Sequence, residues 1–286
     1  MKRNEQARLF DLVTKIIKFI VLWGCAIGMI YPLIWMVVSS LRPELEIFNA
    51  TVRTGTYTFS NYFKGWAGPA GGVSFGIFFK NSFIIVFFVI IGNLLSCSLT
   101  AYALSRLKFK GSGLCFGIML GSMMLPGHVT LIPRYVMFNK LGWMNTFLPM
   151  TAPAFFATNG FFIFLMIQFM RTIPRDFDES ASIDGCNSFR IYANIILPLC
   201  RPVLITTLIF SFIWTWNDFF SQLLYISIPK LMTVSMGLRL FIDSTGTSNW
   251  GALFAMSFLS LIPVFAIFIT CQKQLVQGVI ASGVKG

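Results

Sequence analysis

Long apolar stretches bounded by basic residues dominate the hydrophobic pattern of the chain. A helix that crosses the ~30 Å hydrocarbon layer of a bilayer needs about 20 mostly apolar residues, because each residue adds ~1.5 Å. Six stretches reach that length: 19–41, 81–105, 111–133, about 146–170, 202–229 and about 250–272. Pro32, Pro153 and Pro263 fall inside them, which neighbouring helices can accommodate. The pattern predicts an all-α polytopic membrane protein with six transmembrane helices.

Composition agrees with this interpretation and argues against a soluble fold. Of the 286 residues, 56% are hydrophobic and 11% are charged, whereas a globular domain carries roughly 25% charged residues. The net charge of +12 would suit a nucleic-acid partner in a soluble protein, but no basic run with interleaved aromatic residues offers a binding face. We therefore expect a lipid bilayer, and no nucleic acid, around this chain.

Basic residues also predict the orientation of the spans. Fourteen of the 22 Lys and Arg residues lie in segments 1–18, 106–110, 171–201 and 273–286, and eight lie in the segments on the other side. Because cytoplasmic loops carry the excess of basic residues, we expect both termini in the cytoplasm. The expected organisation is a cytosolic leader, first span and external loop at 1–75, a core with the other five spans at 76–272 and a cytosolic tail at 273–286.

Four of the ten acidic residues lie in the longest cytoplasmic connection. Asp176 and Glu179 have the spacing of a capping box, and Gly185 can end the helix that they begin. Ser188 can then cap a second short helix, which we expect Pro198 to end.

Ile191, Ile195 and Ile196 would share one face of this second helix. The segment 176–198 is thus expected to form a helix–turn–helix at the membrane surface. The physical pattern alone leaves two roles open: a surface connector or a docking site for another protein.

The same segment resembles the EAA signature of binding-protein-dependent ABC importer permeases. That signature reads E-A-A, three residues, G, nine residues and I-x-L-P, and this chain has Glu179-Ser-Ala181, then Gly185, nine residues and Ile195-Ile-Leu197-Pro198. The chain departs from the signature at Ser180 and Cys186, where the family has Ala; both replacements are small, so close packing of the turn is preserved.

Other segments also resemble this family. They are Asn81-Ser-Phe, the run from Ala101 to Gly111, Ile132-Pro133, Trp216-Asn217-Asp218 and the tail from Val276 to Gly286. Together they resemble the carbohydrate-uptake branch, and within it the smaller permease subunit of maltose-type transporters.

The resemblance implies a type I ABC importer permease fold in a bacterial-type cell (inner) membrane. It implies a permease that forms half of the pore for a sugar or oligosaccharide and couples to a separate ATPase through the cytoplasmic segment. The residues assigned to coupling are Glu179, Ser180, Ala181, Asp184, Gly185, Ile195, Leu197 and Pro198.

The resemblance also implies partners. These are a second homologous permease, two copies of a P-loop ATPase and an extracytoplasmic solute-binding protein. The chain lacks the G-x-x-x-x-G-K-[ST] pattern that holds ATP phosphates, so ATP and Mg belong on the partner ATPase. We expect no cofactor, catalytic residue or metal site on this chain, and therefore no enzyme activity.

Polar residues in apolar spans are candidates for the solute path. The candidates are Trp214, Asn217 and Asp218 near the external end of the fifth span and Asn159 in the fourth, because an indole can stack on a sugar ring and carboxylates or amides can bind hydroxyls. An aromatic belt at the membrane interface, with Asp218 in a structural hydrogen bond, explains the same residues.

Two further functions fit part of the pattern. One is an importer permease for a non-sugar solute. The other is an ion-coupled secondary transporter, which would need ionisable residues at the middle of the membrane; only Asp218 lies within an expected span, and it lies near one end.

Overall fold

The computed structural model describes residues 2–48, 55–69, 72–127, 129–242 and 249–283, with side chains described from residue 12 to residue 272. All regular secondary structure in these ranges is helical, which confirms the predicted all-α class. The chain forms two compact units, Met1–Ala70 with Phe241–Leu259 and Gly71–Leu240 with Ser260–Gly286. Helix α14 (Trp250–Gly283) contributes residues to both units.

The first unit contains α1 (Lys2–Ser40), the 3₁₀ turn η1 (Glu44–Glu46), α2 (Ser60–Ala67) and the start of α14. Helix α1 continues through Pro32, and its apolar side chains from Leu12 onward are largely exposed. The carboxylate of Glu44 accepts hydrogen bonds from the backbone N–H groups of Trp250 (2.7 Å) and Gly251 (2.9 Å). It thereby satisfies donors that the start of a helix leaves free.

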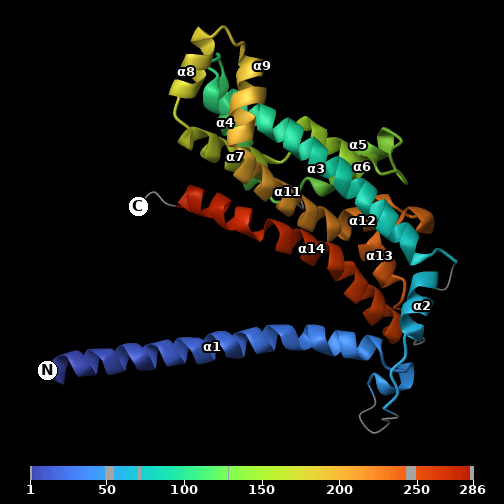
Figure 1. The fold of residues 1–286 in the computed structure, drawn as a ribbon. Helices are drawn as coiled ribbons and strands as arrows, with labels where there is room; N and C mark the ends of the chain where they lie inside the picture. The colour runs from blue at the N-terminus through green and yellow to red at the C-terminus, as the bar shows by residue number, and fades with distance from the viewer. Residues whose placement is uncertain (1, 49–54, 70–71, 128, 243–248, 284–286) are drawn as a thin grey trace. The chain divides into compact units, whose positions relative to one another are not determined.

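The second unit is built around α3 (Phe75–Arg106). This helix packs against α7 (Gly160–Thr172), α11 (Arg201–Trp216) and the 3₁₀ turn η2 (Ala152–Phe156) (Figure 1). Gly92 permits the approach of η2, because a Cβ at that position would lie 2.9 Å from Ala154 Cβ. The buried Asn93 amide donates to Ser211 Oγ at 3.1 Å and links α3 to α11. Small and polar residues of this kind are typical of helix contacts in membranes.

The second unit also contains several shorter elements. They are α4 (Ser112–Met124), α5 (Leu131–Lys140), α6 (Leu148–Thr151), α8 (Asp176–Ile183), α9 (Ser188–Ile191), the π-helix η3 (Tyr192–Ile196), α10 (Leu197–Leu199), α12 (Phe220–Tyr225), η4 (Pro229–Leu231) and α13 (Val234–Arg239). Helices α8 and α9 lie beside the end of α3 that carries Arg106 (Figure 1). At the other end, Asn81 donates to the carbonyls of Lys230 and Met232, both at 2.9 Å.

By length and composition, four helical segments among the described residues can cross a membrane: Leu12–Ser40, Phe75–Arg106, Leu148–Thr172 and Trp250–Gln272. A fifth span arises if Ser188–Leu199 and Arg201–Trp216, bent by 76°, are counted together. The third expected span is shorter than predicted, because α4 ends at Met124 before Pro126 and Gly127. The six expected spans thus correspond to the four long segments, to α11, which is the second half of the bent pair, and to the shorter α4.

Two expected spans are also less regular than predicted. The fourth breaks after η2, where Ala157 has a positive φ of 53°, and the freed carbonyls find side-chain partners. Ser96 Oγ donates to the Ala154 carbonyl at 2.6 Å, and Thr158 Oγ1 donates to the Pro153 carbonyl at 2.9 Å. The fifth was expected to continue to residue 229, but α11 ends at Trp216, so the following residues lie in a connection.

Candidate functional site

The predicted helix–turn–helix is present, and its turn is closed by two backbone hydrogen bonds. Helix α8 ends at Ile183, and Gly185 follows with a φ of +78°. The Cys186 N–H donates to the Ala181 carbonyl at 2.9 Å, and the Gly185 N–H donates to the Ser182 carbonyl at 3.1 Å. This pair of bonds is the Schellman motif, and it confirms Gly185 as the residue that ends the first helix.

The predicted caps are wrong in detail. Arg175, in helical conformation, occupies the N-cap position of α8, and no side chain caps the helix; Asp176 is therefore the first helical residue and does not form a capping box with Glu179. The acidic residues of the first turn still lie where the helix dipole favours negative charge. In the second helix, Asn187 is the cap in place of Ser188: its Oδ1 accepts from the Arg190 N–H at 2.8 Å.

We expected the second helix to end at Pro198, but it does not. It passes through the π-helix η3, where the Leu197 N–H donates to the Tyr192 carbonyl, and continues to Leu199. A bend of 76° at Cys200 then leads directly into α11. The π-turn allows the helix to continue, since Pro198 has no N–H to donate to the preceding turn.

The eight residues assigned to coupling divide into an outer and an inner set. Glu179, Ser180, Asp184, Gly185 and Pro198 are exposed. Ala181 is 5% exposed and, together with Ile195 and Leu197, packs into the hydrophobic core of the second unit. Ala181 was assigned to coupling; the structure places it in a buried cluster with residues of α3 and α7, because the amphipathic α8 buries this side.

The outer set lies among exposed apolar side chains. Phe177, Ile183 and Phe189 are 48%, 86% and 69% exposed, and they come from both helices of the segment. We call residues 176–198 the coupling segment. Its outer face consists of the exposed residues Phe177, Glu179, Ser180, Ile183, Asp184, Gly185, Phe189 and Pro198. Acidic and apolar groups side by side on an exposed surface are typical of a site that binds another protein.

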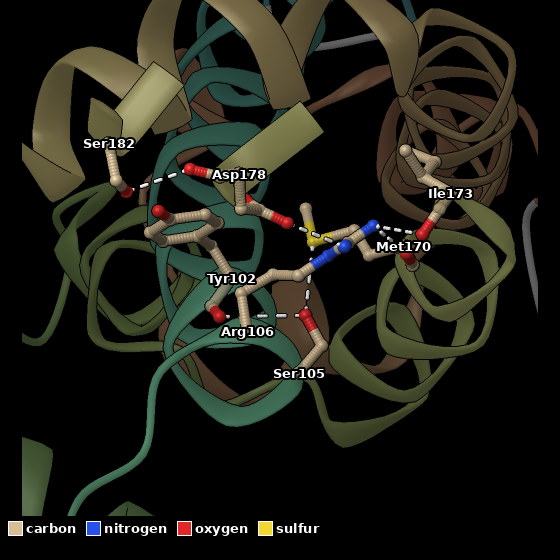
Figure 2. Close-up of polar contacts among 7 residues, drawn as sticks. All are labelled: Tyr102, Ser105, Arg106, Met170, Ile173, Asp178 and Ser182. Atoms are coloured by element: carbon tan, nitrogen blue, oxygen red, sulfur yellow. Dashed lines mark hydrogen bonds and ion pairs between the residues drawn. The ribbon is translucent and has the colours of Figure 1, made fainter. Parts of the chain in front are cut away.

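A partly buried ion pair joins the coupling segment to α3. Arg106 Nη1 donates to Asp178 Oδ2 at 2.7 Å, and the two side chains are 3% and 22% exposed. Arg106 Nη2 donates to the backbone carbonyls of Met170 and Ile173, at the end of α7 (Figure 2). One guanidinium thus connects α3, α7 and α8.

A second polar contact lies further along the same segment. The hydroxyls of Ser98, in α3, and Tyr192, in η3, are 2.7 Å apart. Both halves of the coupling segment are therefore tied to α3, one by Asp178 and the other by Tyr192.

A pocket of about 310 Å³ lies between α3, α7 and α11. Its lining includes Asn93, Asn159, Trp214 and Asp218. Three of the four candidates for the solute path therefore face one cavity, and Asn93 joins them. The indole of Trp214 is 47% exposed and stacks on Phe162 with ring centroids 5.2 Å apart.

The polar groups of this pocket also have structural roles. Asp218 Oδ1 accepts from the Ser221 N–H at 3.0 Å at the start of α12, and Asn159 Oδ1 accepts from the Phe162 N–H at 3.4 Å. Asn217 is outside the pocket lining: its amide donates to the Ile213 carbonyl at 2.8 Å, because it follows the last residue of α11 and bonds back to that helix.

Residues 89–280 match the family model described as "Binding-protein-dependent transport system inner membrane component". This match covers the coupling segment, the pocket and about two thirds of the chain. The chain belongs to this family. It is therefore a multi-pass component of a membrane transport system that works with a solute-binding protein and, as an ABC importer permease, with an ATPase.

Individual relatives extend this similarity to nearly the whole chain. A probable ABC transporter permease protein, YurM of Bacillus subtilis, is 32% identical over 96% of this chain and 89% of its own length. The trehalose/maltose transport system permease protein MalG of Thermococcus litoralis is 33% identical over 91% of this chain and 93% of its own length.

A solved structure shows the same fold. It is a chain of a bacterial ABC transporter involved in the import of the acidic polysaccharide alginate. It has a TM-score of 0.80, covers 92% of this chain and 96% of its own and is 22% identical in sequence. The permease fold expected from the sequence is thereby confirmed.

Arg106 lies in the family-like run from Ala101 to Gly111, and no role was predicted for it. Its contact with Asp178 joins residues 72 positions apart, and nothing in either local pattern indicates the pairing. One signal was available in this sequence: the second expected span is followed directly by the basic Arg106, and the longest cytoplasmic connection carries a cluster of acidic residues.

Proposed function

We propose that the chain is the permease subunit of an ATP-driven importer for a sugar or oligosaccharide and forms half of the translocation pore. The observation that carries this proposal is the coupling segment: a rigid helical hairpin, anchored to α3 and exposing acidic and apolar groups, in a chain that belongs to the importer family. The trehalose/maltose relative supports a carbohydrate as the solute.

The proposed assembly contains a second homologous permease, two copies of a P-loop ATPase and an extracytoplasmic solute-binding protein. Both termini and the coupling segment lie on the cytoplasmic side of the membrane. ATP and Mg bind to the ATPase, and this chain contributes pore walls and a lever without catalysing a reaction. This arrangement uses the outer face as the contact with the ATPase.

In the proposed mechanism, ATP binding closes the ATPase dimer and displaces the coupling segment. Since this segment continues without a loop through η3 and α10 into α11, its displacement reaches a helix that lines the pocket. The pore then opens toward the solute-loaded binding protein, and hydrolysis resets it toward the cytoplasm.

Reversing the charge of the outer face tests the docking role. Glu179→Lys should leave the permease inserted in the membrane but reduce the amount of ATPase that co-purifies with it, because the exposed carboxylate is available to basic groups of the partner. Lys230→Glu is a matched control: it reverses an exposed charge at the opposite end of the second unit. A transport-competent complex recovered in normal yield from Glu179→Lys would refute the proposal.

We propose the pocket of about 310 Å³ as part of the solute path. Pockets that bind small solutes combine an apolar or aromatic wall with a few polar groups, as Trp214 and Asp218 do here. Trp214→Ala should lower solute uptake by the assembled importer, whereas Asn217→Ala, three residues along, should not. Equal uptake by the two variants would remove the pocket from the path, and uptake by purified permease alone, driven by an ion gradient, would favour a secondary transporter.

A further inference from the structure

Arg106 is a buried charge whose contacts define what can move with the coupling segment. A guanidinium with 3% exposure requires partners, since an unpaired charge in an apolar environment is strongly unfavourable. Its partners come from two elements: the Asp178 carboxylate of α8 and the last carbonyls of α7, including that of Ile173 at 2.7 Å. Arg106 itself is the last residue of α3.

This placement makes sliding of α8 past α3 unfavourable. If α8 moved alone, Asp178 would leave Arg106, and both charges would lose their partner in a mostly buried site. If α8, α3 and the end of α7 moved together, every contact would persist. Packing favours joint movement too, because Ala181 of α8 belongs to the same buried cluster as Ala101 of α3 and Met170 of α7.

We propose that Arg106 is a positioning residue that clamps the coupling segment to α3 and α7, so that displacement of α8 by the ATPase is transmitted to both helices. This inference rests on the proposed function and adds a route to it. The continuous path through α10 and α11 carries one half of the movement, and the Arg106 clamp carries the other. The solute pocket is lined by α3, α7 and α11.

The clamp is tested in the fully assembled importer by the amount of solute transported per ATP hydrolysed. Asp178→Asn keeps the shape of the side chain but removes its charge, and Arg106→Gln removes the guanidinium. We expect solute transported per ATP to fall by about fivefold or more, within the range of typical coupling between sites. Basal ATP hydrolysis and the yield of ATPase bound to the permease should stay normal, which a merely unstable permease would not allow.

Two further variants sharpen the test. Lys108→Gln removes a basic charge two residues beyond Arg106, where the side chain is exposed, and should leave coupling unchanged. The double variant Arg106→Gln/Asp178→Asn should be no worse than the more affected single variant, because both substitutions remove the same ion pair. If Arg106→Gln does not fold, Asp178→Asn decides, since Arg106 then keeps its carbonyl contacts.

Unchanged solute transport per ATP in an intact Asp178→Asn complex would overturn the clamp, and so would additive losses in the double variant. These outcomes are distinct from failure of the proposed function. The Glu179→Lys variant reports whether the ATPase docks on the outer face, whereas the Asp178→Asn variant reports what happens after docking.

Discussion

Replacing Gly185 should loosen the turn between α8 and α9 without disturbing any neighbouring side chain. A Cβ at this position would meet no other atom within 4 Å, so the whole effect comes from its φ of +78°. For an L-residue the left-handed conformation costs about 1–2 kcal/mol. Opening of the turn should therefore become about 5- to 30-fold more frequent in Gly185→Ala. Asn tolerates this conformation better than Ala, and the β-branched Val tolerates it worst.

Hydrogen exchange of the coupling segment in the membrane-inserted permease measures this opening. The amides of Gly185 and Cys186 close the turn, so their exchange should accelerate in the order Gly, Asn, Ala, Val. ATPase retention should fall in the same order, because a loosened segment must be ordered again on docking. Gly117→Ala in α4, where φ is ordinary and no atom lies within 4 Å, is the control. Equal exchange in the Asn and Val variants would refute the reasoning.

Two other substitutions test contacts within the second unit. Gly92→Ala should destabilise the permease by about 1–3 kcal/mol through overpacking against η2. The control is Gly121→Ala, whose new Cβ meets no atom within 4 Å, so thermal stability in detergent should be unchanged or higher. A lower melting temperature only in the Gly121 variant would contradict this. Tyr192→Phe should cost about 1 kcal/mol through loss of the hydrogen bond with Ser98. Thermal unfolding measures this loss, and an equally large further loss on adding Ser98→Ala would show that the hydroxyls act independently.

Helix class and the position of the coupling segment could be predicted from the sequence because both depend on local patterns. Apolar length identifies spans, and a glycine after an amphipathic run identifies a helix end. Gly185 has the positive φ that such a stop requires, and Ile191 and Ile195, four residues apart, both pack at the core cluster as this spacing predicts. Each of these features can be read within one or two helical turns.

Features that depend on tertiary contacts could not be predicted. The fourth span breaks at a point where the Ser96 hydroxyl of α3 donates a hydrogen bond to the freed carbonyl of Ala154. These two residues are 58 positions apart in the sequence. Both short helices begin one residue earlier than predicted. Arg175 is already in helical conformation at the start of α8, and at α9 the Asn187 side chain accepts from the backbone in place of Ser188. The pocket likewise assembles Asn159 and Trp214 from separate helices, and a single sequence does not contain that pairing.

The π-helix η3 shows why one face of the coupling segment can be buried along its whole length. In an α-helix of 3.6 residues per turn, two positions five residues apart point ~140° away from each other. Ile191 and Ile196 are five apart, yet they are 5% and 0% exposed in the same core cluster. Closure of the backbone between Tyr192 and Leu197, also five apart, brings such positions nearly into line. The same turn carries the helix past Pro198, so a single local irregularity both seats the segment on the core and keeps it continuous with α11.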